Sequence, residues 1–426
     1  MEVFKFGGAS VKDAQGVKKV ANIIQQHQDK KLLVVVSAMG KTTNLLEKLV
    51  QAYFSNHPDD QNMYFQQLKT EHEAIARDLF PDRQADIYKM LDDLLTLLQE
   101  KLQEPSSENY DFEYDQIVSF GELLSSKIVA AFLQQTGMNA LWLDARKLLR
   151  TDNTYREGTV DWETTQRKVN NKVLPYYSDN QTHIVLTQGF IGGTSEGLTT
   201  TLGREGSDFS AAVFAFTLNA DKMTIWKDVN GLLNADPKLF ANTIKLDNIS
   251  YQEAIELAYY GASVIHPKTL KPLQNKKIPL FVRSFIHPET CGSAIGDFKT
   301  KNKIPCFICK KKQVLISIMP KDFSFIAEEN LSTIFALFAY FGVKINLMQN
   351  SAISFSLCVD NKENMKHLIE ELQTEFFVKY NTDVELFTIR NYDEESINSI
   401  VKGRKIILEQ KNRSTVQYIL KNEKDN

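Results

Sequence analysis

The sequence predicts an α/β fold, with a mostly parallel central sheet in an α-β-α sandwich, followed by a smaller α+β region of ferredoxin-like plan. Apolar segments alternate with helical segments from the amino terminus onward, and segments such as LLVVV at 32–36 are apolar throughout. Uniformly apolar strands are typical of parallel sheets covered by helices on both faces. After residue 303 the order becomes strand, helix, strand, strand, helix, which predicts the second region.

Composition predicts a globular protein of two or three domains that binds small molecules. The chain has 426 residues, of which 43% are hydrophobic and 24% charged, with a net charge of -3. This charge provides no positive field for nucleic acid. No apolar run reaches the length of a membrane helix, and MEVFKFGGASV lacks the layout of a signal peptide. We therefore expect a cytoplasmic protein without nucleic-acid or membrane partners.

The four cysteines do not predict a disulfide framework in a chain of this length. Cys306 and Cys309 form a C-x-x-C, but the residues between them are apolar and no second pair follows. We expect a buried strand here, with zinc or redox chemistry as the alternative.

The first three hundred residues alternate between strands and helices around one helical insertion. Strands are expected at 3–6, 32–36, 139–143, 182–190, 222–226 and 278–284, and helices at 14–28, 122–135, 207–218 and 251–262. Residues 45–105 carry leucines at helical spacing, which predicts a helical elaboration at about 45–115 beside the sheet.

The pattern changes beyond a polar segment at 299–303, which we take as the linker. Strands at 314–319, 344–349 and 351–359 with helices at 332–341 and 362–376 form the ferredoxin-like plan. A strand at 384–389, a helix at 394–401 and strands at 405–409 and 415–420 form a partial repeat without a second helix. The predicted domains are 1–298, 304–380 and 381–426.

A glycine pair follows the first strand in KFGGAS at 5–10. Glycines at such a turn allow backbone N–H groups to approach phosphate oxygens at the positive end of a helix, and Lys5 stands beside them. The alternative is an ordinary turn with a surface lysine nearby.

A second loop, GGTSEGLTTTLGREGSDFSA at 192–211, combines glycines and hydroxyls with Arg204 and Asp208 between a buried strand and a helix. This density favours anion binding. Ser207 or Asp208 could alternatively cap the following helix.

Two common nucleotide-binding motifs can be excluded from the sequence. SAMGKTT at 37–43 resembles the end of a P-loop, but the position of its first glycine is Val35, inside a strand. No G-x-G-x-x-G opens the first helix, which argues against a dinucleotide fold.

Six motifs in order resemble aspartate kinases, and the resemblance runs essentially end to end. They are KFGG-x-S at the start, SFGELLSSK at 119–127, TTLGREGSD at 200–208, WKDVNGLLNADP at 226–237, YGASVIHPKTL at 260–270 and ILEQKNRSTV at 407–416. The resemblance implies an amino-acid kinase fold for 1–298, an ACT regulatory domain at 304–380 and a partial second ACT module. It also implies a monofunctional enzyme that converts L-aspartate and ATP to 4-phospho-L-aspartate, the first step of lysine, threonine and methionine biosynthesis.

The resemblance also implies roles for individual residues. Lys5 and Asp208 would be catalytic, with Asp208 orienting Lys5 toward the transferring phosphoryl group. Aspartate would be held by Arg204 through its α-carboxylate, by Glu122 through its ammonium group, and elsewhere by Ser37, Thr43, Phe190 and Ser207. ATP would be bound by Lys5, Gly7, Gly8, Ser10, Trp226, Lys227, Asp228, Leu233, Lys238 and Ser263, with Mg²⁺ held through its phosphates and no metal site on the protein. Lysine or threonine would be the effector, near Met319, Phe325, Asn346 and Gln349, and the ACT domains would pair in a homodimer.

The chemistry agrees with these residue roles, which include cations but no general base, because the side-chain carboxylate of aspartate is already an anion. The barrier is electrostatic, so Lys5, Arg204 and Mg²⁺ are expected to neutralise it. Ala9, Leu233 and Ser263 depart from the family pattern around the nucleotide. Two alternatives stay open: another amino-acid carboxylate or carbamate kinase of this fold, and a catalytically silent amino-acid sensor.

Overall fold

The computed structural model describes residues 1–178, 184–262, 265–299, 303–322 and 324–422. The chain forms two compact units. The first unit contains Met1–Leu232, Leu246–Ile255 and Ile265–Lys299, and the second contains Leu233–Lys245, Glu256–Val264 and Thr300–Asn426. The predicted domain bounds (1–298, 304–380 and 381–426) stay predictions. Most of the predicted linker lies outside the described residues.

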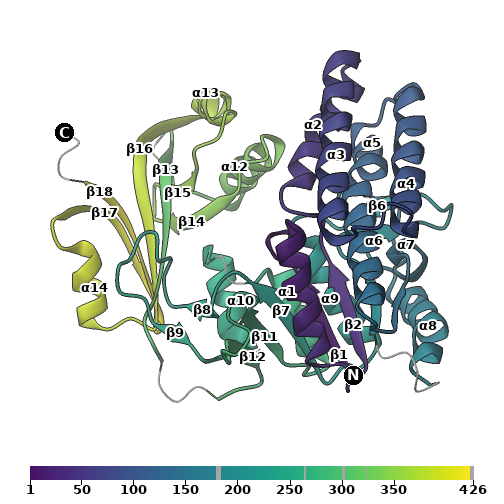
Figure 1. Cartoon of the computed structure of the whole chain (residues 1–426). Coiled ribbons are helices and arrows are strands. Elements are labelled where there is room, and N and C mark those ends of the chain that lie inside the picture. The colour runs from purple at the N-terminus through teal and green to yellow at the C-terminus, as the bar shows by residue number, and fades with distance from the viewer. Residues whose placement is uncertain (179–183, 263–264, 300–302, 323, 423–426) are drawn as a thin grey trace. The chain divides into compact units, whose positions relative to one another are not determined.

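The first unit is built on an eight-stranded sheet with the order β10-β12-β11-β7-β1-β2-β4-β3 (Figure 1). All neighbouring strands are parallel except β11 and β12, which confirms the predicted parallel sheet. The strands are β1 (Glu2–Phe6), β2 (Leu32–Val36), β3 (Ala140–Trp142), β4 (Ile184–Gln188), β7 (Lys222–Lys227), β10 (Asn248–Ser250), β11 (Leu280–Ser284) and β12 (Ser293–Gly296). Two short pairs, β5 (Ile191–Gly193) with β6 (Thr199–Thr201) and β8 (Leu232–Leu233) with β9 (Lys245–Leu246), lie outside this sheet.

The central strands β1, β2 and β4 are buried along their whole length. Helices on both faces of the sheet bury them. Phe4 and Phe6 of β1 belong to a core cluster with α1 (Ala14–Gln25), α4 (Asp86–Gln103) and α6 (Phe120–Gln135). The intervening side chains of a strand point to the opposite face. There α9 (Gly206–Thr217), which contributes no residue to that cluster, contacts β1, β2 and β7.

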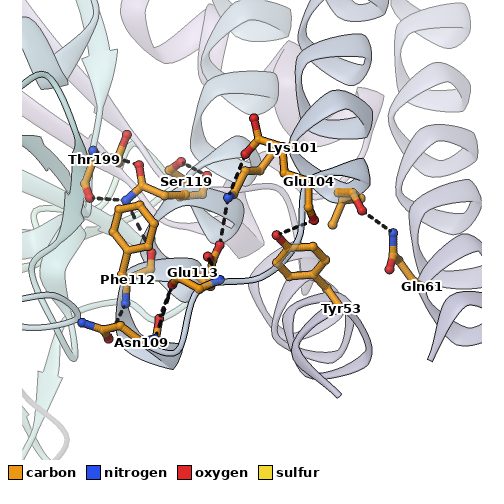
Figure 2. A network of polar contacts seen from close by, with 12 residues as sticks. Tyr53, Gln61, Lys101, Glu104, Asn109, Phe112, Glu113, Ser119 and Thr199 are labelled. Atoms are coloured by element: carbon orange, nitrogen blue, oxygen red, sulfur yellow. Dashed lines mark hydrogen bonds and ion pairs between the residues drawn. The ribbon is translucent and has the colours of Figure 1, made fainter. Parts of the chain in front are cut away.

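The predicted helical elaboration is confirmed as a layer of helices packed together. It contains α2 (Thr42–Phe54), α3 (Pro58–Leu79), α4 and α5 (Tyr110–Val118). Figure 2 shows the polar contacts that join these helices: the Lys101 ammonium lies 3.1 Å from a carboxylate oxygen of Glu113, whose side chain is 1% exposed. Burial lowers the pKa of Lys101, but its hydrogen bonds to Glu113 and Glu104 outweigh burial and raise it.

The segment 110–135, which contains α5 and α6, is long and apolar enough by composition to cross a membrane. In this fold 78% of its most apolar window is buried. A mostly buried helix of this kind is ordinary for the core of a folded domain.

Shorter elements connect these layers in the first unit. They are η1 (Gly8–Val11), α7 (Ala145–Leu148), α8 (Trp162–Lys172), η2 (Leu174–Tyr177), α10 (Tyr251–Tyr260), which continues into the second unit, and α11 (Pro267–Asn275). The helix predicted at 14–28 begins at Ala14 as expected and ends at Gln25, and the 3-10 turn η1 precedes it. The side chain of Asp13 caps α1 by accepting a hydrogen bond from the Gly16 amide.

The second unit contains a six-stranded sheet with the order β14-β15-β13-β16-β18-β17, in which all neighbours are antiparallel. Its elements are β13 (Cys306–Pro320), α12 (Glu328–Tyr340), β14 (Ile345–Asn350), β15 (Phe355–Asp360), α13 (Met365–Glu375), β16 (Phe376–Arg390), α14 (Glu394–Val401), β17 (Arg404–Lys411) and β18 (Thr415–Asn422). The order through β16 is β-α-β-β-α-β, which confirms the ferredoxin-like plan.

Two strands of this sheet are longer than the sequence predicts. The strands expected at 314–319 and 384–389 are parts of β13 and β16, which are 15 residues each. Their pairing shifts register near Gln313, and Lys312 and Asp383 have positive φ there. Bulges of this kind bend a strand without ending it, so both modules share one sheet. The strand expected around CFIC is confirmed as part of β13, but it is buried only at alternate residues: Cys306 is buried and Cys309 is half-buried. Both cysteines are free thiols.

Candidate active site

A cavity of about 980 Å³ lies in the first unit, where β1, β2 and β4 end. Parallel strands bring their carboxyl ends to one edge of a sheet, which is where ligands bind in open α/β folds. Predicted site residues that line the cavity are Lys5, Gly8, Ser37, Thr43, Glu122, Phe190, Arg204, Ser207, Asp208 and Lys227. The fold thus collects side chains that are more than two hundred positions apart in the sequence.

Lys5 and Asp208 form a buried ion pair in this cavity. The Lys5 ammonium nitrogen lies 2.6 Å from Oδ1 of Asp208, and both side chains are at most 10% exposed. Lys5 points to the α9 face because it alternates with Phe4 and Phe6 along β1. Nζ of Lys227, on β7, lies 3.9 Å from Oδ2 of the same aspartate, so two cations share one carboxylate.

Gly8 allows the loops after β1 and β2 to touch. A Cβ atom at this position would lie 2.8 Å from the Ala38 carbonyl oxygen, which is closer than real contacts. The Gly40 amide donates to the Gly8 carbonyl across the same contact. The glycine is therefore required for backbone packing, and this contact places Ser37 and Thr43 on the cavity wall.

Glu122, on α6, is a buried acid with an incomplete set of partners. The residue is 2% exposed. Its Oε1 accepts a 3.3 Å hydrogen bond from the Ala38 amide, while Oε2 is buried and accepts none within the described part of the chain. Burial raises the pKa of Glu122 to about 8. A carboxylate in this state is suited to bind a cationic group that enters the cavity.

The turn before α9 corrects one alternative from the sequence. The N-cap position of α9 is Glu205, at φ 55°, so neither Ser207 nor Asp208 caps the helix, and both line the cavity. Phe190 also has a positive φ of 68°. A Cβ at Gly206 would lie 2.7 Å from its ring, which explains that glycine.

A second wall of the cavity was not predicted. It is lined by Glu47, Asp111, Tyr114, Thr154, Tyr155, Arg156 and Glu157. The Arg156 guanidinium lies 4.4 Å from the centre of the Tyr114 ring, and the Tyr114 hydroxyl donates to Glu47 at 2.8 Å. The run of polar residues at 152–158 could have indicated this wall. Its contacts with α2 and α5, however, form only in the tertiary structure.

Asp115 holds this second wall in place through hydrogen bonds. It accepts hydrogen bonds from the Arg156 amide and from both the amide and hydroxyl of Thr201. Burial raises the pKa of Asp115 to about 6, against the effect of these hydrogen bonds. The carboxylate thereby joins α5 to β6 and to the loop that carries Arg156.

Several predicted nucleotide residues lie off the cavity wall. Gly7 is adjacent to it, because a Cβ there would lie 3.5 Å from Nζ of Lys5. The Ser10 hydroxyl is directed to the Trp226 carbonyl at 3.4 Å. The ring of Trp226 is 1% exposed and stacks on Phe6. The side chains of Ser10 and Trp226 therefore belong to the core, and the roles predicted for Ser10 in the phosphate loop and for the strand end at Trp226 beside ATP stay predictions.

The other residues predicted to contact ATP stay predictions. Asp228 is exposed in the loop after β7. Leu233 and Lys238 belong to the second unit, and Ser263 lies outside the described residues.

Of the four predicted effector contacts, Asn346 has an internal role. Its Oδ1 accepts from the Lys310 ammonium at 2.8 Å, and its amide donates to Gln313 and Asp360 at 2.8 and 3.1 Å. The side chain of Asn346 is therefore engaged within the second unit, and its predicted contact with an effector stays a prediction. Met319 is half-buried at the end of β13, and Phe325 and Gln349 are exposed.

Across the described residues, no three His, Cys, Asp or Glu side chains gather in a way that would hold a metal ion. The cavity still offers carboxylates beside cations. Mg²⁺ commonly takes most of its ligands from phosphates and water, so this donor set is compatible with a nucleotide-borne Mg²⁺.

Comparisons with known proteins agree with this architecture. The Amino acid kinase family model matches residues 1–284. Lysine-sensitive aspartokinase 3 of Escherichia coli is 32% identical over 366 residues, covering 84% of this chain and 78% of that protein. Aspartokinase 1, chloroplastic, of Arabidopsis thaliana is 30% identical over 394 residues, covering 87% of this chain and 67% of that protein.

Solved structures extend the similarity over both units. The chain matches E. coli aspartokinase III in complex with lysine and aspartate (T-state) with a TM-score of 0.83 and 26% identity, covering 99% of this chain and 96% of that one. The same protein in complex with aspartate and ADP (R-state) gives a TM-score of 0.81, with the same identity and coverage. This chain therefore belongs to the aspartokinases of the amino acid kinase family.

Proposed function

We propose that this chain transfers the γ-phosphoryl group of ATP to the side-chain carboxylate of L-aspartate. The observation that carries the proposal is the cavity that gathers the Lys5–Asp208 pair, Arg204 and the buried carboxyl of Glu122. Such a set matches a ligand with phosphate, carboxylate and ammonium groups. The E. coli relative solved with aspartate and ADP supports the same substrates.

In this reaction an oxygen of the aspartate side chain forms a bond to the γ-phosphorus while the bond to the β,γ-bridging oxygen breaks. The products are ADP and an acyl phosphate, and no proton has to leave the acceptor. Two anions must approach each other, so stabilisation by cations dominates. Lys5 supplies such a cation, and Asp208 holds its ammonium group in place.

Aspartate would be recognised by complementary charges. Arg204, an exposed residue on the cavity wall, binds the α-carboxylate, and Glu122 accepts the ammonium group at its buried oxygen. The hydroxyls of Ser37, Thr43 and Ser207 and the ring of Phe190 surround the remainder.

ATP would lie with its phosphates near Lys5, Gly7 and Gly8, close to Lys227 and Asp228. When bound with ATP, Mg²⁺ neutralises phosphate charge. We keep Ser10, Trp226, Leu233, Lys238 and Ser263 as the further ATP contacts that the resemblance to aspartate kinases implies.

The second unit would bind an effector amino acid. The E. coli relative was solved in complex with lysine, and we propose lysine before threonine as the inhibitor. Met319, Phe325, Asn346 and Gln349 are the candidate contacts, in a homodimer paired through this unit in the cytoplasm. Inhibition assays with each amino acid and light scattering at several protein concentrations test these points. Activity unaffected by lysine would refute the effector proposal.

A hydroxamate assay with ATP, Mg²⁺ and either aspartate or glutamate tests the main proposal. Aspartate should give acyl hydroxamate and glutamate should give none. Failure to form acyl phosphate from aspartate would refute the activity.

Substitution of the catalytic cation tests the mechanism. Lys5→Met should lower kcat by about 10²- to 10³-fold with a smaller change in the KM for aspartate. Lys41→Met is the matched control, because Lys41 is exposed at the N-cap of α2 and does not line the cavity. Equal effects of the two variants would remove Lys5 from its role.

A further inference from the structure

Residues 201–206 carry Arg204 from the end of β6 to the start of α9, and we call this segment the 201–206 turn. Arg204 is exposed on the wall of the candidate active site. Its guanidinium has no hydrogen bond or ion pair within the described part of the chain. The position of this cation therefore depends on the backbone of the turn.

The backbone of the 201–206 turn needs support from outside itself. Glu205 has φ 55°, in the left-handed region that is uncommon for residues other than glycine. Such a conformation persists only where the surrounding structure holds it. Part of this support is backbone pairing: the Gly158 amide donates to the Thr201 carbonyl at 2.8 Å. Two sets of side-chain contacts supply the rest.

The first set comes from Asp115, on α5. Its Oδ2 accepts a hydrogen bond from the Thr201 amide at 2.9 Å, and its Oδ1 accepts one from the Thr201 hydroxyl at 2.7 Å. Both residues are fully buried. Oδ2 also accepts from the amide of Arg156, at 2.8 Å, and Arg156 is itself left-handed at φ 65°. One buried carboxylate thus holds the first residue of the turn through charge-assisted hydrogen bonds.

The second set comes from the beginning of α11. The Lys268 ammonium donates to the Leu202 carbonyl at 3.1 Å, and the amide of His266, the N-cap residue, donates to the Glu205 carboxylate at 3.1 Å. The Lys268 ammonium also lies 4.7 Å from the centre of the Phe209 ring, a cation–π contact. Burial lowers the pKa of Lys268. These contacts hold the turn on both sides of Arg204 in the sequence.

We propose that Asp115 and Lys268 are positioning residues for aspartate, because together they fix the 201–206 turn and so place the Arg204 guanidinium where it binds the α-carboxylate. Neither residue lines the cavity, so both act through the turn and not on the ligand. The inference rests on the proposed function, in which Arg204 binds that carboxylate, and it adds the residues that determine how well this contact is made.

The inference predicts a selective kinetic change. The α-carboxylate takes no part in bond making, so its contact with Arg204 is equally strong in the ground state and in the transition state. Loss of such a contact raises the KM and leaves kcat nearly unchanged. The proposed phosphate contacts Lys5, Gly7 and Gly8 follow β1 and lie outside the turn, so the KM for ATP should also stay the same.

Asp115→Ala is the first test. It removes the acceptor of three hydrogen bonds and should raise the KM for aspartate by about tenfold, as the loss of a charged hydrogen-bonding partner does. Glu113→Ala is the matched control, because Glu113 is also a buried acid on α5 but does not line the cavity or contact the turn. A general loss of stability would affect both variants alike.

Lys268→Met is the second test. Methionine keeps an unbranched apolar chain against Phe209 but cannot donate to the Leu202 carbonyl, and the KM for aspartate should rise by about fivefold. Lys271→Met is the matched control, because Lys271 is an exposed residue of the same helix. If Asp115→Ala does not fold, this second pair of variants decides by itself.

A raised KM for aspartate in the folded variants of Asp115 and Lys268, with the KM for ATP and both controls at wild-type values, supports the inference. A wild-type KM for aspartate in either folded variant would overturn it. So would a parallel rise in the two KM values, or an equal rise in Glu113→Ala.

Calorimetric titration of the full chain with aspartate, without ATP, separates this inference from the proposed function. The Kd for aspartate should rise in the two variants by the same factors as the KM. A wild-type chain that neither binds nor phosphorylates aspartate would refute the proposed function and the inference with it. An active wild-type chain whose affinity is unaffected in both variants would refute the inference alone.

Discussion

Replacement of Glu122 by glutamine should affect binding and stability in opposite directions. The carboxyl is buried, one of its oxygens has no hydrogen-bond partner among the described residues, and burial raises its pKa to about 8. When aspartate binds, its ammonium group would complete a buried ion pair. Removing one partner of such a pair costs about 3–5 kcal/mol. Because the carboxyl is mostly protonated at pH 7, ionising it costs about 1.4 kcal/mol, which is subtracted from the ion-pair contribution.

The net loss in Glu122→Gln is about 1.6–3.6 kcal/mol, which corresponds to a KM for aspartate between about 15-fold and about 400-fold higher. The wild-type kcat/KM for aspartate should rise about tenfold from pH 6 to 7 and level off above pH 8, because only the ionised carboxylate binds the ammonium group. The variant should lose this slope. Steady-state kinetics at saturating ATP across this pH range measure both effects.

Glu157→Gln is the matched control, because Glu157 lines the same cavity but is exposed. This control shares every other titration of enzyme and substrates, so its pH slope should equal that of the wild type. If the slope survives in Glu122→Gln, or if the KM for aspartate is unchanged, Glu122 does not bind the ammonium group.

The same substitution should stabilise the ligand-free protein. The Glu122 carboxyl has a pKa of 4.5 as a free side chain and about 8 in the fold. The folded state therefore holds an extra proton between these values, and stability falls as pH rises from 4.5 to 8. Glutamine removes a penalty of up to about 3 kcal/mol at pH 7. Calorimetry at pH 5 and 7 should show a Tm advantage for the variant that grows with pH, and a lower Tm at pH 7 would contradict the assignment.

Three further substitutions separate structural roles from functional ones. Glu113→Gln leaves the partly buried Lys101 ammonium without its buried partner and should lower the free energy of unfolding in urea by about 3 kcal/mol. The KM for aspartate should not change. A changed KM would instead link this network to the active site. Gly8→Ala forces a Cβ to within 2.8 Å of the Ala38 carbonyl and should lower Tm and kcat together, so retention of full activity would show that the two loops can separate. Asn346→Ala removes three hydrogen bonds within the second unit and should cost about 1–3 kcal/mol of its stability in thermal unfolding, and an unchanged transition would argue against a structural role.

Much of the active cavity could be predicted because its parts follow local rules. The glycine pair after β1 and the loop before α9 are recognisable as short motifs, and parallel strands place both at one edge of the sheet. The ring of Trp226 faces the same core cluster as Phe4 and Phe6, so only the strand end at this residue stays a predicted neighbour of ATP. The wall formed by Tyr114 and Arg156 was missed because its contacts join segments that are 42 residues apart.

The sequence by itself determined the parallel sheet, the helical layer and the membership of the kinase family, because these depend on periodicity and on motifs that are contiguous in the chain. Only the tertiary structure decided that β13 and β16 continue through two modules and that Glu122 and Arg150 hold buried polar atoms without partners in the part of the chain that the structure describes. Burial and hydrogen-bond satisfaction depend on which distant segments pack together, and no local pattern specifies that packing.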